Sequence, residues 1–250
     1  MKFSFRIILL LTILLSNCKS KHQGEKKPGL LSNLVNITDN EDKGIKEIIA
    51  FYGGQCEYGV EKKISSNGNN QTNFWMKFSR SHITDSVSIF TELASSNIAY
   101  MFFKNLKDET GSYDNIRTEI LLADGHSLKD EFLMNELELV KKKIPTVLNV
   151  VNLLTERKFQ ELKTLLKFDS SFYNYDKNDM IKGIESAEND YGKAGVFKMY
   201  GFRFFRSNSG TIILRIEGII SRNGGNSAFV VDSDPDSQSN EIFYLNYKLE

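Results

Sequence analysis

Apolar and polar residues alternate along two neighbouring stretches in the first half of the chain. The apolar positions are Cys56, Tyr58, Val60 and Ile64 in the first stretch, and Phe74, Met76 and Phe78 in the second. A period of two is typical of strands that bury one face. The segment between them, SSNGNNQT, is rich in Asn and Gly, so the pattern predicts a hairpin.

Apolar residues at intervals of three and four predict a helix on each side of this hairpin. The set before it ends at Gly53-Gly54 and consists of Ile45, Ile48, Ile49 and Tyr52. The set after it consists of Ile98, Met101, Phe102 and Leu106. A further strand is expected with one face formed by Ile116, Thr118, Ile120 and Leu122. The first half is therefore predicted to be an α-β-β-α-β unit.

The second half begins with helical patterns and ends in strands. Two apolar stripes flank Pro145, which predicts a kink or a break: Leu133, Leu137, Val140 and Ile144, then Val147, Val150, Val151 and Leu154. Two shorter helices are expected near 159–166 and 180–191. Alternating strands follow, joined by a hairpin turn at Asn223-Gly224, with a helix-facing side formed by Leu214, Ile216, Leu245 and Tyr247. The fold class predicted is α+β, with helices packed on a C-terminal antiparallel sheet.

Three segments of the second half carry a family resemblance. VVNLLTERKFQELKTLLKFD, YGKAGVFKMYGF and EIFYLNYKL follow one another in an order that resembles the cone-shaped α+β fold of nuclear transport factor two-like proteins. The resemblance covers residues 140–250 and implies a sheet that curls around a pocket. That fold hosts isomerases, dehydratases, carriers and many non-enzymatic modules, so it names no chemistry for this chain.

The first 18 residues predict export and lipid attachment. Lys2 and Arg6 precede an apolar run at 7–15, which is the outline of a signal peptide. Nine residues are too few to span a membrane as a helix, which needs about 20. LSNC at 15–18 resembles a lipobox, which implies cleavage before Cys18 and attachment of palmitate and other acyl chains to that residue. Ordinary secretion and an uncleaved anchor are the alternatives.

These signals divide the chain into four parts and predict its location in the cell. We expect a signal peptide at 1–17, a flexible tether at 18–39, a small α+β domain at 40–127 and a domain of helices and β-meander at 128–250. The residue after the lipidated cysteine is Lys19, whereas Asp in that place resembles an inner-membrane retention signal of lipoproteins. The resemblance therefore favours the outer membrane, with the chain facing the periplasm or the cell surface.

The charge balance argues against nucleic acid as a partner, and the cysteine content argues against an internal disulfide. The chain has 32 basic and 32 acidic residues, so it lacks the basic excess typical of proteins that bind nucleic acid. It has 2 cysteines, and with Cys18 lipidated, Cys56 has no partner for an internal disulfide. We expect Cys56 to be a buried core residue.

The catalytic and metal-binding motifs that the sequence suggests are all incomplete. Asp232, Asp234 and Asp236 resemble the start of an EF-hand loop, but Gly and Glu are missing at the later positions, so a polar turn is expected. The three histidines are far apart in sequence, and His82, beside Ser81 and Asp85, is better explained as a surface residue. We therefore expect no catalytic residue, no metal and no cofactor.

One group of charged residues in the second half could bind a ligand. Arg203, Arg215 and Glu217 fall in neighbouring strands, where they could orient a polar or anionic ligand or form ion pairs on a solvated sheet face. The function predicted is a non-enzymatic envelope lipoprotein that binds a protein or a small ligand. Two alternatives stay open, a small lipid-anchored hydrolase or isomerase, and an immunity or inhibitor protein against an envelope toxin.

Overall fold

The computed structural model describes residues 37–64, 68, 70–81, 91–167, 173 and 175–249. The expected signal peptide, Cys18 and nearly all of the tether lie outside these residues, and so do His82 and Asp85. Among the residues described, no helix is long and apolar enough to cross a membrane.

The first half forms a four-stranded sheet with two helices on one side. Its strand order is β1-β2-β3-β4, with β2 and β3 parallel and the outer pairs antiparallel. The predicted α-β-β-α-β order is confirmed, and a fourth strand is added to it. The elements are α2 (Asp39–Tyr52), β1 (Gln55–Lys63), β2 (Gln71–Ser79), α4 (Thr91–Leu106), the 3-10 helix Lys107–Ser112, β3 (Asn115–Leu121) and β4 (Ser127–Leu133).

The second half has the predicted order of helices followed by an antiparallel meander, β5-β6-β7-β8. Leu214, Ile216 and Leu245 are buried as expected, while the side chain of Tyr247 lies outside those described. The elements are α5 (Met134–Thr155), α6 (Phe159–Leu165), α7 (Lys177–Tyr191), β5 (Phe197–Arg206), β6 (Ile212–Arg222), β7 (Gly225–Ser233) and β8 (Tyr244–Leu249).

The helix α5 continues through Pro145 without a break, contrary to one of the two outcomes expected there. Pro145 lacks the N–H that would bond to the carbonyl of Lys141, which weakens a helix at that point. Val140 on one side and Val147 on the other are both buried in the core. Burial of both flanks keeps the helix in one piece, because tertiary packing outweighs local propensity.

Local signals in the sequence set where the helices begin and end. At the start of α2, the Thr38 side chain accepts a bond from the backbone N–H of Glu41, and the Glu41 carboxylate accepts one from that of Thr38. This capping box satisfies two N–H groups that the helix leaves free. The helices α2 and α7 end at Gly53 (φ 69°) and Gly192 (φ 87°), where positive φ favours glycine.

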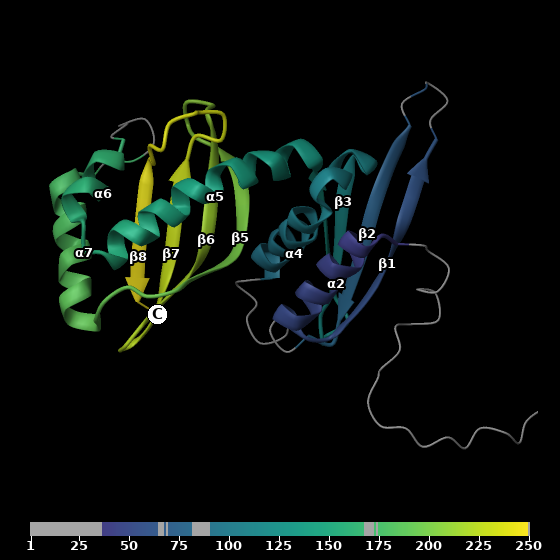
Figure 1. Cartoon of the computed structure of the whole chain (residues 1–250), viewed down its shortest axis with the longest axis horizontal. Helices are drawn as coiled ribbons and strands as arrows, with labels where there is room; N and C mark the ends of the chain where they lie inside the picture. Colours follow the sequence, from purple (N-terminus) through teal and green to yellow (C-terminus); the bar gives the residue numbers. More distant parts are fainter. Residues whose placement is uncertain are drawn as a thin grey trace, which may run out of the picture.

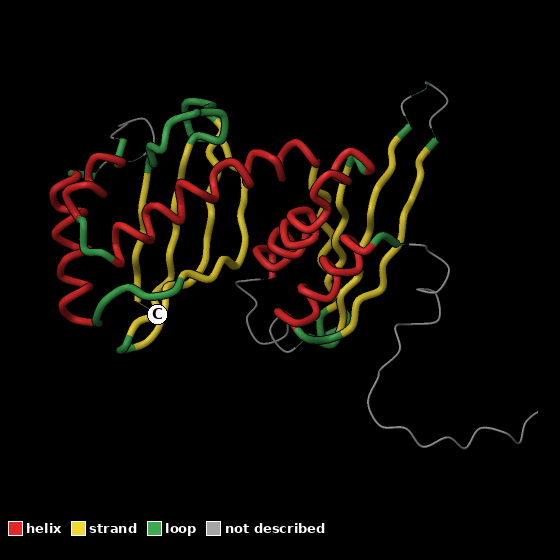
Figure 2. Tube along the Cα trace, viewed as in Figure 1, coloured by secondary structure: helices red, strands yellow, loops and turns green. Residues whose placement is uncertain are grey.

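The helices lie on the same side of both sheets, so the molecule has a helical layer and a strand layer (Figures 1 and 2). The helix α4 packs on β3 and β4 of the first sheet and also on β5 of the second. The approach to β5 is very close, because a Cβ on Gly201 would lie 2.2 Å from the carbonyl oxygen of Leu93. The backbone N–H of Phe202 donates to Ser96 Oγ of α4 at 2.8 Å.

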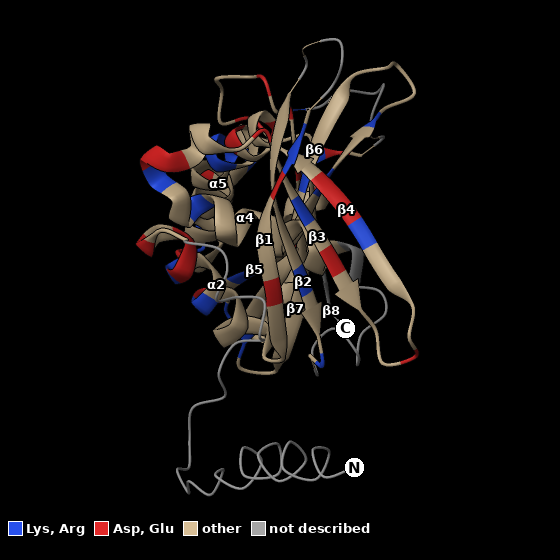
Figure 3. Ribbon diagram, turned by 90° about the vertical axis from the view of Figure 1, so that its right-hand side faces the viewer, with Lys and Arg blue, Asp and Glu red and all other residues tan. Residues whose placement is uncertain are grey.

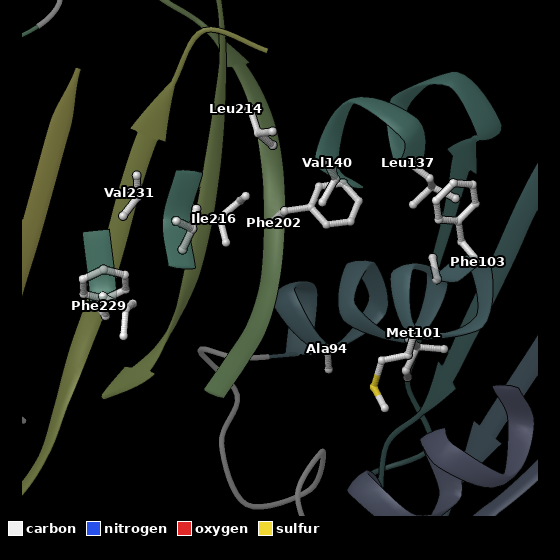
Figure 4. Packing of buried hydrophobic residues seen from close by; sticks show 14 of the residues in the cluster. Ala94, Met101, Phe103, Leu137, Val140, Phe202, Leu214, Ile216, Phe229 and Val231 are labelled. Atoms are coloured by element: carbon white, nitrogen blue, oxygen red, sulfur yellow. The ribbon is translucent and has the colours of Figure 1, made fainter. Parts of the chain in front are cut away.

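One hydrophobic cluster runs through both halves. Figure 4 shows Phe202 of β5 beside Val140 of α5, between Phe103 of the first half and Ile216 of the second. The boundary expected between residues 127 and 128 falls inside β4, which pairs with β3. Residues 140–250 therefore share one hydrophobic cluster with the first half.

The predicted face of β1 is buried at its start and exposed at its end. Cys56 is buried against the helices, and this burial raises the pKa of its thiol. Val60 and Ile64 are exposed, Ile64 to 85%, because the hairpin of β1 and β2 projects beyond the helices (Figure 1).

Burial of Cys56 predicts slow reaction with thiol reagents. In the folded chain the thiol is shielded and its raised pKa keeps it in the unreactive protonated form. We expect Cys56 to resist an iodoacetamide pulse in native buffer and to be labelled fully in denaturant, with mass spectrometry of the Cys56 peptide as the measurement. Fast labelling in native buffer would show that the register of β1 differs by one residue.

Candidate functional site

The first sheet turns one face to the helices and leaves the other open. Residues at even positions, such as Phe74, Phe78 and Ile116, are buried under α2 and α4. Residues at odd positions share the open face because side chains alternate along a strand. Across β1, β2, β3 and β4, three successive rungs of the open face are Glu57-Lys77-Glu119-Lys129, Gly59-Trp75-Arg117-Glu131 and Glu61-Asn73-Asn115-Leu133.

Ion pairs run across the strands of this open face. Lys77 and Lys129 approach the two carboxylate oxygens of Glu119, at 3.4 and 3.5 Å. Arg117 pairs with Glu131 at 2.7 Å and with Glu61 on the far side of β2. Figure 3 shows the acidic and basic residues on neighbouring strands of this sheet. Each partly exposed pair contributes only about 0.2 to 1 kcal/mol to stability, so the pairs mainly set the orientation of the side chains.

Glu131 also connects the ion pairs to buried amides. The Asn115 side chain donates to Glu131 at 2.8 Å and to the side-chain oxygen of Asn73 at 3.0 Å. Both asparagines are buried. The position of Glu131 is therefore determined from two sides, by Asn115 and by Arg117.

Trp75 lies in the middle rung and is the one tryptophan of the chain. A Cβ on Gly59 would lie 2.9 Å from both Nε1 and Cζ2 of Trp75 and 3.0 Å from Cε2. Because three ring atoms are nearly equidistant from that point, the plane of the indole faces Gly59. The absence of a side chain at Gly59 lets the ring lie flat across β1.

The open face is hollowed into a trough of about 640 Å³ around Trp75. All of its lining among the described residues comes from the four strands, and six charged residues of the rungs contribute to it: Glu61, Lys77, Arg117, Glu119, Lys129 and Glu131. Small-molecule sites have volumes of about 300 to 1,000 Å³. The trough is thus large enough for a ligand and presents one aromatic surface within a ring of hydrogen-bonding groups.

The open face of the second sheet carries the three charged residues singled out from the sequence, and all three have partners. Arg203 pairs with Glu217 at 2.7 Å. Arg215 instead forms two hydrogen bonds of 2.7 Å with the carboxylate of Asp232, which is 0% exposed. The expectation of a solvated ion pair does not hold for Arg215, because its partner is buried.

Aromatic residues enclose the Arg215–Asp232 pair. The guanidinium lies 5.0 Å from the ring centre of Phe205, and the Tyr173 hydroxyl donates to Asp232. The Tyr173 ring stacks on Tyr244 with 4.5 Å between ring centres. Burial raises the pKa of Tyr173 most, and the hydrogen bond to the Asp232 carboxylate raises it further. The arrangement satisfies a buried carboxylate and has the character of a structural cluster.

Asp232 was expected in a polar turn and was therefore not predicted as a partner of Arg215. The structure places it in β7, directly opposite Arg215 of β6. A signal was present, since Asp232 follows Val230 at the strand period while Phe229 and Val231 occupy the buried face.

The candidate catalytic and metal-binding residues that the structure describes have other partners. Within these ranges no group of three or more His, Cys, Asp or Glu residues is placed to hold a metal ion. His126 is exposed in a turn beside Asp124. The buried Ser81 hydroxyl donates to the carbonyl of Tyr52 at 2.6 Å, so it is held by the backbone of α2.

Compared with known proteins, the chain matches no family model, no curated protein and no solved structure. The resemblance to nuclear transport factor two-like proteins therefore stays a prediction, and function has to be argued from the chain's own geometry.

The partners of the two arginines predict different effects of their removal. Arg215→Ala leaves Asp232 buried without its cation, and we expect a loss of about 3 kcal/mol in the free energy of unfolding, since Arg215 itself is only 22% exposed. Arg203→Ala, where the arginine is 51% exposed, is the matched control and should lose no more than about 1 kcal/mol. Urea unfolding followed by circular dichroism measures both. Equal, small losses would contradict a structural role for the Arg215–Asp232 pair.

Proposed function

We propose that the protein is a lipid-anchored envelope lipoprotein that acts as a non-enzymatic binding module, and that it binds through the trough of the first sheet. The observation that carries the proposal is the trough itself, about 640 Å³ of open space around Trp75. Its polar groups are oriented by cross-strand pairing. A site whose groups are oriented before binding loses less entropy when the ligand arrives.

The chemistry of the trough favours binding over catalysis. General acid–base catalysis needs a group that can transfer a proton near neutral pH, most often histidine. The trough is lined by no His or Cys among the described residues, and its lysines, its arginine and three of its four carboxylates are committed to ion pairs. Around Arg215, the open face of the second sheet carries Tyr173 and Asp232, and both bond to the arginine.

The anchor supports this function by holding the module near the membrane. The signal peptide and the lipobox-like Cys18 are the basis for attachment, and α2, the first helix of the described residues, begins after its cap at Thr38. A chain of 20 residues from Cys18 to Thr38 spans at most about 70 Å. The tether therefore sets an upper limit on how far the binding face reaches from the lipid surface.

Lipid attachment at Cys18 can be tested by substitution in the native host. Cys18→Ala removes the thiol that would carry the lipid, so metabolic labelling with an alkyne fatty acid should disappear and the chain should leave the membrane fraction or accumulate as precursor. Cys56→Ala is the control and should leave labelling unchanged, because Cys56 is buried in the fold. Labelling that persists in Cys18→Ala would rule out this anchor.

Binding in the trough can be followed through Trp75, which alone supplies tryptophan fluorescence. Adding a soluble extract of the host envelope to the purified full chain should shift or quench the emission in a saturable manner, because a ligand in the trough displaces water from the indole. The Arg215→Lys variant, altered on the other sheet, should respond equally. An emission spectrum that stays constant up to the highest extract concentration would count against the trough as the binding surface.

A further inference from the structure

The trough also indicates the class of its ligand. We propose that it binds an uncharged saccharide, with the Trp75 indole stacked against one face of a sugar ring and the surrounding charged pairs bonded to its hydroxyl groups. This inference rests on the proposed function, because it names the ligand of the same site.

The charges of the trough argue against a ligand of high net charge. Three basic and three acidic residues of the open face line it, and every one of the six is in an ion pair with another member of the set. Asp130 adds one further carboxylate from an even position of β4. A polyanion or a polycation would meet charges of its own sign beside charges of the opposite sign, so attraction and repulsion would largely cancel and little Coulomb energy would be gained.

The same pairs suit hydroxyl groups. A lysine ammonium has three donor protons and a carboxylate has about four acceptor positions, so a single ion pair leaves several of them unused. A hydroxyl both donates and accepts, and it can bridge Lys77 and Glu119, or Arg117 and Glu131, without separating the charges. Hydrogen bonds to charged groups are roughly twice as strong as those between neutral groups.

The indole supplies the apolar part of the site. Gly59 lies behind one face of Trp75, which leaves the other face turned to the trough. A pyranose ring has C–H groups on its faces and hydroxyls at its rim, so a flat aromatic surface ringed by polar groups matches it. A peptide ligand would instead place several large apolar or aromatic side chains in separate pockets, whereas the described lining of the trough offers a single aromatic surface, that of Trp75.

Two glycine substitutions test the role of the Trp75 ring separately from the stability of the fold. In Gly59→Ala the new methyl group would lie 2.9 Å from the indole, so the ring or the strand must shift, while none of the ion-paired side chains is substituted. Gly183→Ala adds the same methyl group to α7, where, apart from its chain neighbours and the nearby backbone of the helix itself, no atom lies within 4 Å of it. We expect Gly59→Ala to weaken binding about tenfold, which corresponds to about 1.4 kcal/mol. Gly183→Ala should bind as the unsubstituted chain does, and both variants should melt within a few degrees of it.

The test uses three probes made from one host envelope extract: a proteinase K digest freed of peptides, the same material after periodate cleavage of its diols, and the periodate-treated protein fraction. The full chain is titrated in a detergent without a sugar headgroup, and Trp75 emission is recorded. The proposal predicts a saturable response to the first probe, none to the second or third, and weaker binding in Gly59→Ala.

The remaining outcomes overturn the inference in distinguishable ways. A response to the protein fraction, with none to the saccharide digest, would reject a saccharide and leave the trough as a protein-binding surface. A response that periodate does not abolish, or that Gly59→Ala leaves unchanged, would also reject sugar stacking on Trp75. No response to any probe or to the untreated extract would reject the proposed function together with the ligand class.

Discussion

The close contact between α4 and β5 determines how the rest of the molecule is arranged. At Gly201 the strand approaches so near to Leu93 that any side chain would collide with the helix, and Ser96 fixes the contact by accepting the N–H of Phe202. Because α4 also packs on β3 and β4, one helix joins the two sheets into a single core. With the helices on one side of both sheets, each sheet has a second face whose residues must be compatible with water (Figure 2).

The two open faces meet this requirement in different ways. On the second sheet, Asp232 is fully buried and is satisfied by Arg215 and Tyr173, under a cover of aromatic rings. On the first sheet, the pairs around Trp75 are partly exposed and surround an open trough. Breaking a buried pair such as Arg215–Asp232 costs much stability, so that pair serves the fold. The exposed pairs around Trp75 keep further donors and acceptors available to a ligand. This difference is why we assign binding to the first sheet.

The sequence predicted the elements with strong apolar periodicity, and it missed features that depend on strand pairing. The helices α2, α4 and α7 and the hairpin of β1 and β2 were all visible from spacing and glycine stops. The strand β4 was missed because most of its residues are exposed, including the run Lys129–Glu131, so no alternation marks it. Such charged edge strands also discourage pairing with other chains.

The candidate site was missed for the same reason. Glu119 meets Lys77 and Lys129 only because three strands are in one register, and a slip of one residue would send these side chains to the other face. The residues chosen from sequence, Arg203, Arg215 and Glu217, did fall on one open face, but the partner of Arg215 came from a strand segment that had been predicted as a turn.

We propose that the ligand binds on the open face of the first sheet. Amide and indole chemical shifts, recorded by nuclear magnetic resonance on the ¹⁵N-labelled full chain while envelope extract is added, test it most directly. The account predicts that the single indole resonance of Trp75 moves together with amides of its neighbours on β2 and β3, while resonances of α7 and of the Arg215 cluster stay in place. Shifts confined to the second sheet or to the helices, with Trp75 unmoved, would contradict it.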